Sequence, residues 1–90
     1  MGSCEFLSLC KQQVAKYFNT HVDKSDTTTI SEDDVYVVWY CKTLQNHKAL
    51  LSTPISDGMY YECTYNGDKK ELYFDAYKKW ENLCIELTEG

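Results

Sequence analysis

The amino-acid sequence predicts an α+β domain with an N-terminal helix, a four-stranded antiparallel meander sheet and a C-terminal helix. Apolar residues recur with helical spacing near both ends of the chain. Between them lie four runs rich in β-branched and aromatic residues, separated by short polar turns. A chain of 90 residues has room for one domain, which we assign to residues 1–90, with residues 1–4 left out of the predicted fold.

The first half of the chain predicts one helix and two strands. Over residues 5–19, Phe6, Cys10, Val14 and Phe18 recur every four residues and form an apolar stripe. Residues 23–34 are polar and acidic, which indicates a loop. Residues 35–43 are apolar on both faces until Lys42, so we expect a central strand there. A polar turn at residues 45–47 leads to a second strand at residues 48–53.

The second half predicts a hairpin. Residues 59–65 and 68–74 flank an Asn66-Gly67 pair, which is typical of a two-residue β-turn. Such a turn sets Tyr61 opposite Leu72 and Met59 opposite Phe74, so that apolar side chains share one face. The same register sets Glu62 opposite Glu71 and Tyr60 opposite Tyr73.

From residue 75 the apolar period becomes helical. Tyr77, Trp80, Cys84 and Leu87 share one helical face, and the Asp75 carboxylate can accept hydrogen bonds from free N–H groups at the helix start. We therefore expect a C-terminal helix.

Charge and cysteine content narrow the classes of function. Fourteen acidic residues against nine lysines, with no arginine, give a net charge of −5, which disfavours direct binding of nucleic acid. Five cysteines are an odd number without tight spacing, which favours reduced thiols in a cytosol over a disulfide framework. No apolar run approaches the roughly 18 residues of a membrane span, so we expect no membrane association.

Three patterns that could support chemistry are weak. Residues 23–34 place oxygen ligands at alternate positions, as a calcium loop does, but Thr28 stands where the sharp turn needs glycine. Cys41 and His47 could form a nucleophile–base pair, although a buried strand cysteine beside an exposed turn histidine is the simpler interpretation. The sequence contains no Cys-x-x-Cys zinc motif. We expect no cofactor, no metal and no enzymatic activity.

Two groups of residues are candidates for binding a partner. If helices cover only one sheet face, Tyr60 and Tyr73 lie on the open face, near Tyr36 or Tyr40, where tyrosine offers contact area at low entropic cost. The alternative is a cross-strand aromatic pair that only stabilises the sheet. The second group consists of the acidic residues of the loop, which can attract a basic partner. The candidates are Asp23, Asp26, Glu32, Asp33, Asp34, Tyr60 and Tyr73.

Four segments carry a resemblance to a known family: VYVVWYCKTLQN at residues 35–46, GMYYE at 58–62, YNGD at 65–68 and DAYKKWEN at 75–82. They resemble a family of short proteins of unknown function from phages and prophages of Gram-positive bacteria, over about residues 5–87. The resemblance implies a phage protein in the cytoplasm of a bacterial host, and it assigns no catalytic or binding residue.

Together these observations predict a phage accessory protein that binds a host or phage protein. An acidic, arginine-free, tyrosine-rich surface could occupy a basic groove meant for nucleic acid, and so inhibit a nucleic-acid-handling or defence protein, for example of CRISPR type. The alternatives are a structural or housekeeping role in the phage and, third, a cysteine- or metal-dependent enzyme.

Overall fold

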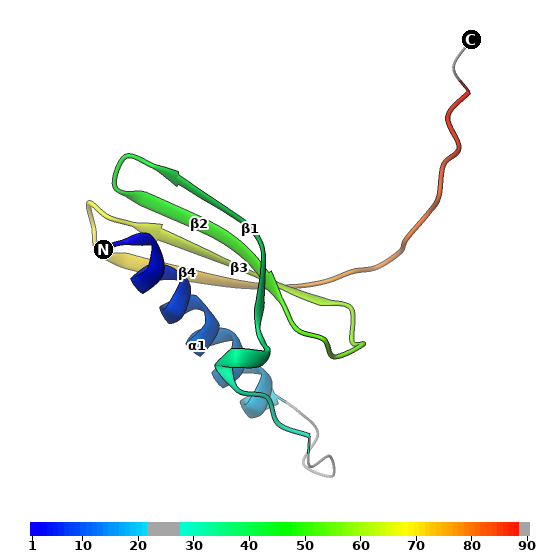
Figure 1. Cartoon of the computed structure of the whole chain (residues 1–90), viewed down its shortest axis with the longest axis horizontal. Helices are drawn as coiled ribbons and strands as arrows, with labels where there is room; N and C mark the ends of the chain where they lie inside the picture. Colours follow the sequence, from blue (N-terminus) through cyan, green and yellow to red (C-terminus); the bar gives the residue numbers. More distant parts are fainter. Residues whose placement is uncertain (22–27, 89–90) are drawn as a thin grey trace.

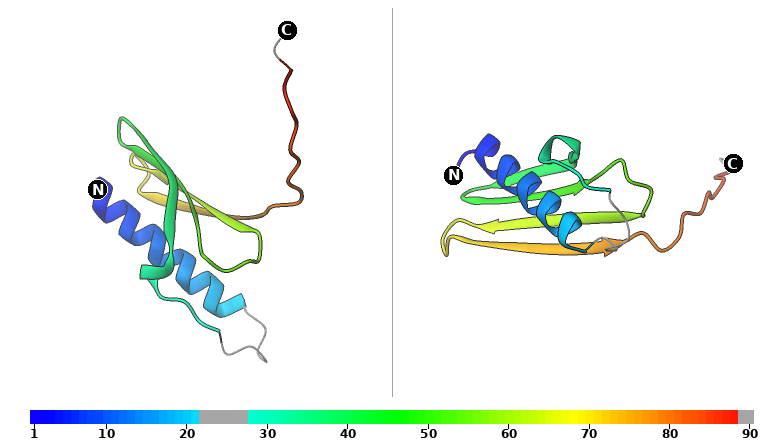
Figure 2. Two further views of the ribbon diagram at one scale, coloured as in Figure 1. Left: turned by 45° about the vertical axis from the view of Figure 1, so that its right-hand side comes forward. Right: turned by 90° about the horizontal axis from the view of Figure 1, so that it is seen from below.

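A computed structural model describes residues 1–21 and 28–88 and shows one helix packed on one sheet. The elements are α1 (Ser3–His21), the 3-10 turn η1 (Glu32–Asp34), β1 (Tyr36–Thr43), β2 (Asn46–Ser52), β3 (Met59–Asn66) and β4 (Glu71–Lys78). The strands form an antiparallel sheet in the order β1-β2-β3-β4, which confirms the predicted meander (Figure 1). The helix lies across one face of this sheet (Figure 2).

The predicted first helix is confirmed, and it extends two residues further at each end. Its stripe of Phe6, Cys10 and Val14 is fully buried against the sheet. At its end, the Thr20 hydroxyl donates to the Lys16 carbonyl and His21 Nδ1 donates to the Tyr17 carbonyl. Both are bonds from a side chain to the carbonyl four residues earlier, and they add to the backbone hydrogen bonds of the last turns of the helix.

The core lies between α1 and the middle strands. Ala49 and Leu51 of β2 and Cys63 of β3 are fully buried beneath the helix, and Tyr61 is 2% exposed. The chain that returns from α1 to the sheet is tied down by the Asn19 amide, which bonds both the N–H and the carbonyl of Ile30. These hydrogen bonds, together with the buried side chain of Ile30, hold the segment before β1 against the helix.

The predicted C-terminal helix is absent from the structure. Its first turn, residues 75–78, belongs to β4 instead, where Lys78 pairs with Met59. Residues 79–88 form neither helix nor strand. The hairpin provides ladder hydrogen bonds along all of β4, whereas the roughly ten residues that remain are too few for a stable isolated helix.

The hairpin register differs from the prediction by four residues. Leu72 pairs with Tyr65 rather than Tyr61, and Phe74 pairs with Cys63 rather than Met59. The connection spans residues 67–70, because the Asn66 side chain accepts the N–H groups of Asp68 and Lys69 and so forms a wider turn. A shift by an even number of residues keeps each side chain on its predicted face.

The predicted central strand, β1, is an edge strand in the sheet. In a meander the first strand has one neighbour, so each side chain of β1 is flanked by another strand on one side only. The turn to β2 lies at residues 44–45 rather than 45–47, with Leu44 in the left-handed region at φ +56°.

Contact between the two hairpin turns predicts a specific sensitivity at Gly67. A Cβ atom there would overlap the Gln45 carbonyl oxygen, while the Gly67 N–H donates to the Asn46 side chain. We expect Gly67→Ala to lower the free energy of unfolding by about 1–3 kcal/mol, as measured by urea titration. Gly2→Ala is the control, because open space surrounds that position. Equal stability of the two variants would contradict this contact.

The buried Tyr61 hydroxyl predicts loss of stability in alkali. Burial, with smaller contributions from Asp57 and Tyr17, raises the pKa of Tyr61 to about 12. A phenol with a raised folded pKa stabilises the fold below its unfolded pKa of about 10, and that contribution falls as pH rises toward 12. Between pH 9.5 and 11.5, the wild type should lose roughly 1.5–2 kcal/mol more unfolding free energy than Tyr61→Phe. Parallel pH profiles of the two proteins would refute the assignment.

Candidate functional site: the open sheet face

One face of the sheet carries no second layer. The helix covers the opposite face, as the view along the sheet shows (Figure 2). On β3 and β4, Tyr61, Cys63, Leu72 and Phe74 point toward the helix side, so the residues between them point outward. The outward side chains have no helix above them.

A β-bulge decides which β1 residues join the open face. The pairing of β1 with β2 shifts between Val37 and Trp39, so Val38 is an extra residue. Beyond the bulge the alternation is reversed. Trp39 therefore pairs with Leu50 on the open face, whereas Tyr40 pairs with Ala49 and lies 5.9 Å from the Phe6 ring of the helix. The prediction that Tyr40 could lie on the open face was wrong.

Exposed aromatic side chains dominate this face. Tyr36 is 49% exposed, Trp39 42%, Tyr73 52% and Tyr77 51%. Large aromatic side chains at such exposure are typical of surfaces that bind other molecules. We call these four side chains, together with the partly buried Leu50 and Tyr60, the open-face patch.

The charged side chains on this face are mostly acidic. Lys48 Nζ lies 3.4 Å from Glu62 Oε1, and Asp75 stands opposite Glu62 on β4. The Tyr73 hydroxyl donates to Glu71 Oε2 at 2.5 Å, and this hydrogen bond, with the charge of Glu71, raises the pKa of Tyr73. Three carboxylates against one ammonium leave the open face negative.

The two predicted tyrosines reach this face, but not as a pair. Tyr60 stands opposite Tyr77, and Tyr73 stands opposite Thr64, because the register slides by four residues. The sequence-based set missed Trp39 and Tyr77. The bulge concealed Trp39, and the helical period concealed Tyr77, although Tyr73, Asp75 and Tyr77 alternate with Leu72, Phe74 and Ala76 as strand residues do.

The predicted acidic residues lie elsewhere. Glu32, Asp33 and Asp34 form η1, which lies beside α1 on the helix side of the sheet (Figure 2). Glu32 and Asp33 line a hollow of about 350 Å³ with helix residues, including Lys11. Asp23 and Asp26 lie outside the described residues. The structure therefore does not bring Glu32–Asp34 together with the two tyrosines.

Cys41 and His47 lie on opposite faces of the sheet and do not form a catalytic pair. The exposed Cys41 is on the open face, while His47 is 2% exposed beneath the helix. This arrangement reverses the predicted buried cysteine and exposed histidine. The His47 ring stacks on Phe6, its Nδ1 lies 2.6 Å from the Tyr40 hydroxyl, and its Nε2 donates to the Met1 carbonyl. His47 thus has a structural role in the core.

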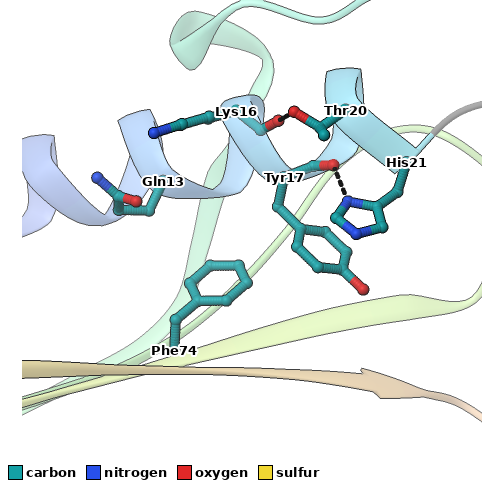
Figure 3. A pocket seen from close by; sticks show the side chains of 6 residues that line it. All are labelled: Gln13, Lys16, Tyr17, Thr20, His21 and Phe74. Carbon is teal, nitrogen blue, oxygen red and sulfur yellow. Dashed lines mark hydrogen bonds between the residues drawn. The ribbon is translucent and has the colours of Figure 1, made fainter.

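A cleft of about 260 Å³ lies between the second half of α1 and β4 (Figure 3). The rings of Tyr17 and Phe74 form its floor, with centroids 5.4 Å apart. His21 stacks on Tyr17 at 4.0 Å and is held by the Tyr17 carbonyl, so its ring belongs to the helix terminus. Lys16 stands at the rim. The cleft is mainly an apolar gap between helix and sheet.

Within residues 1–21 and 28–88, no three histidine, cysteine or acidic side chains come close enough to hold a metal ion. The first five residues of the calcium-like loop, 23–27, fall outside the described residues. In the same described part of the chain, no helix combines the length and apolar character needed to cross a bilayer.

The five thiols predict a sharp division in reactivity. Cys10 and Cys63 meet in the core, where the hydrogen bond with Cys63 and burial raise the pKa of the Cys10 thiol and keep it in its unreactive form. Cys4, Cys41 and Cys84 are exposed. Under native conditions we expect a thiol reagent to modify the three exposed cysteines first, and the buried pair only as the protein unfolds. Peptide mass spectrometry over time measures this, and rapid native labelling of Cys10 would contradict it.

Among the comparisons with known proteins, only the comparison with protein families finds a match. No curated protein and no solved structure matches the chain. A family of unknown function, DUF6275, matches residues 7–87, which is most of the chain. The structure of this chain is one helix on one side of a four-stranded meander sheet, with an aromatic open face. By its sequence, the chain belongs to the DUF6275 family.

Proposed function

We propose that this protein acts by binding another protein through the open-face patch. The observation that carries the proposal is the uncovered sheet face, on which four aromatic side chains are 42–52% exposed. Burying them against a partner would remove apolar area from water while their polar tips keep hydrogen-bonding capacity. The four hydrogen-bonded strands beneath these side chains hold them in fixed positions relative to one another.

The charge of the face indicates the chemistry of the partner. Glu62, Glu71 and Asp75 accompany the aromatic residues, and the whole chain has a net charge of −5 without arginine. Such a surface repels phosphate backbones and complements a basic, partly apolar protein surface. A protein groove that binds nucleic acid has this character. The proposed role is thus an acidic inhibitor of a nucleic-acid-handling or defence protein, made by a phage and acting inside its bacterial host.

The first test separates contact on the patch from general stickiness. The wild type and its variants are immobilised, and the proteins they capture from a bacterial lysate are quantified, followed by binding kinetics with the main captured protein. We expect Tyr73→Ser and Tyr77→Ser each to speed dissociation, with a loss of about 1–3 kcal/mol in binding free energy. Leu44→Ser is the matched control, since Leu44 is 87% exposed at a turn outside the patch. Equal binding by all three variants would refute the proposal.

The second test asks whether charge acts locally. Glu71→Gln with Asp75→Asn removes two charges on the open face, and Glu32→Gln with Asp33→Asn removes two charges beside the helix. Both changes alter the net charge equally. We expect the open-face pair to slow association more and to flatten its salt dependence more, because exposed charges act mainly on encounter. Equal effects would assign the attraction to net charge rather than to this face.

A further inference from the structure

The C-terminal segment, residues 79–88, exposes apolar side chains with no partner on the body of the chain. Trp80 is 92% exposed, Leu83 68%, Ile85 75% and Leu87 86%. The segment runs away from the sheet (Figure 1). In an extended chain, Leu83, Ile85 and Leu87 fall on one side and Cys84, Glu86 and Thr88 on the other. The segment thus has one apolar side that is left in water.

The dimensions of a single copy show how much surface is left uncovered. Its accessible surface is 6797 Å², whereas a compact monomer of 10.5 kDa is expected to expose about 5,400 Å². Its radius of gyration is 15.6 Å, against about 12 Å for a compact domain of this length. The excess of about 1,400 Å² exceeds the roughly 800 Å² that each partner buries in a standard protein interface.

The course of the chain directs the segment outward. The Lys79 N–H donates to the Gly58 carbonyl at 2.6 Å, which continues the β3–β4 pairing one residue past β4. The backbone is therefore fixed in the strand direction up to residue 79. Neither glycine nor proline lies between residues 79 and 88, and Asn82 is the one residue of the segment that favours a turn.

We propose that the C-terminal segment of one copy covers the open-face patch of a second copy, in a reciprocal two-fold dimer. The patch offers exposed aromatic rings and Leu50, and the segment offers Trp80 and three aliphatic side chains. A two-fold exchange buries both sets twice and leaves no open surface for further addition. The inference rests on the proposed function only in taking the same patch as a binding surface. A heterologous partner would displace the segment.

Salt distinguishes the dimer from the complex with a basic partner. Each copy has a net charge of −5, so two copies repel each other at long range and associate through apolar contact. Raising the salt concentration should therefore strengthen the dimer, whereas it should weaken binding of a basic protein. Because salt has opposite effects on the two complexes, the dimer and the binding of a basic partner can be tested, and can fail, independently of each other.

The mass of the full chain in solution provides the first test. Light scattering during gel filtration, from micromolar to several hundred micromolar, should give a mass approaching twice 10.5 kDa. Leu83→Ser with Leu87→Ser should raise the dimer dissociation constant at least about tenfold. Because both residues are exposed in the single copy, the fold should be unaffected. Asn82→Ser with Thr88→Ser is the matched control in the same segment, since it also leaves the net charge unchanged, and it should keep the dimer. A mass of one copy at every concentration would overturn the proposal.

Cross-linking between labelled and unlabelled copies locates the contact. Cys84 lies in the segment, and Cys41 lies on the open face. Cys84 lies on the side of the segment opposite Leu83, Ile85 and Leu87, so a reagent must reach around the segment. In a mixture of ¹⁵N-labelled and unlabelled protein, a bifunctional thiol reagent with a flexible spacer should join Cys84 of one copy to Cys41 of the other. Mass spectrometry distinguishes mixed-isotope links from links within one copy. Links found only within one copy would show that the segment folds back on its own chain, and a dimer linked through other residues would place the contact elsewhere; either result would overturn the proposal.

Discussion

The packing of α1 on the middle of the sheet is the interaction on which the rest of the structure depends. Phe6, Cys10 and Val14 enter the core from the helix, and Leu51 and Cys63 meet them from β2 and β3. With the other helix-side residues they form the one hydrophobic cluster of the described chain, and it lies on one side of the sheet. A single helix about 10 Å wide can cover only part of one face of a four-stranded sheet. The open face and the cleft beside β4 both follow from this limit.

Because the core lies on one side, the outward side chains are free of any role in the interior. Threonine and charged residues would suit a sheet face that only meets water, yet this face carries Tyr36, Trp39, Tyr73 and Tyr77. The proposed contact with another protein surface would explain an exposed patch of this kind on a small domain. The C-terminal segment poses the same physical problem, since its apolar side chains are also exposed. One chain thus presents both an uncovered apolar face and an apolar segment.

The sequence predicted the elements whose signal is local and repeated. The four-residue recurrence of Phe6, Cys10 and Val14 identified α1, and β-branched and aromatic runs identified four strands in the correct order. The sheet faces of residues 59–65 and 71–74 were also predicted, because a slide of four residues preserves the alternation. What could not be predicted depended on single residues. The extra residue Val38 exchanged the faces of Trp39 and Tyr40, and the Asn66 side chain widened a turn that its Asn-Gly sequence suggested would be tight.

The C-terminal residues illustrate a competition between two regular patterns. Residues 75–87 fit a helical stripe, but residues 71–78 also fit a strand, and pairing with β3 outweighs the local helical preference. Candidate site residues could be placed correctly only within strands, where the alternation of side chains predicts the face of the sheet. Tyr60 and Tyr73 reached the open face, whereas Glu32, Asp33 and Asp34 joined the helix side because η1 packs beside α1.

The central claim is that the open sheet face is an interaction surface, and hydroxyl-radical footprinting tests it most directly. Oxidation rates of Trp39, Tyr73 and Tyr77 are measured in dilute protein, in concentrated protein and after addition of a captured partner. We expect these three side chains to be oxidised readily when the protein is dilute and to become protected on concentration or partner binding, while Leu44 keeps a constant rate. Constant rates at the three aromatic residues under all conditions, with protection found only on α1, would contradict it.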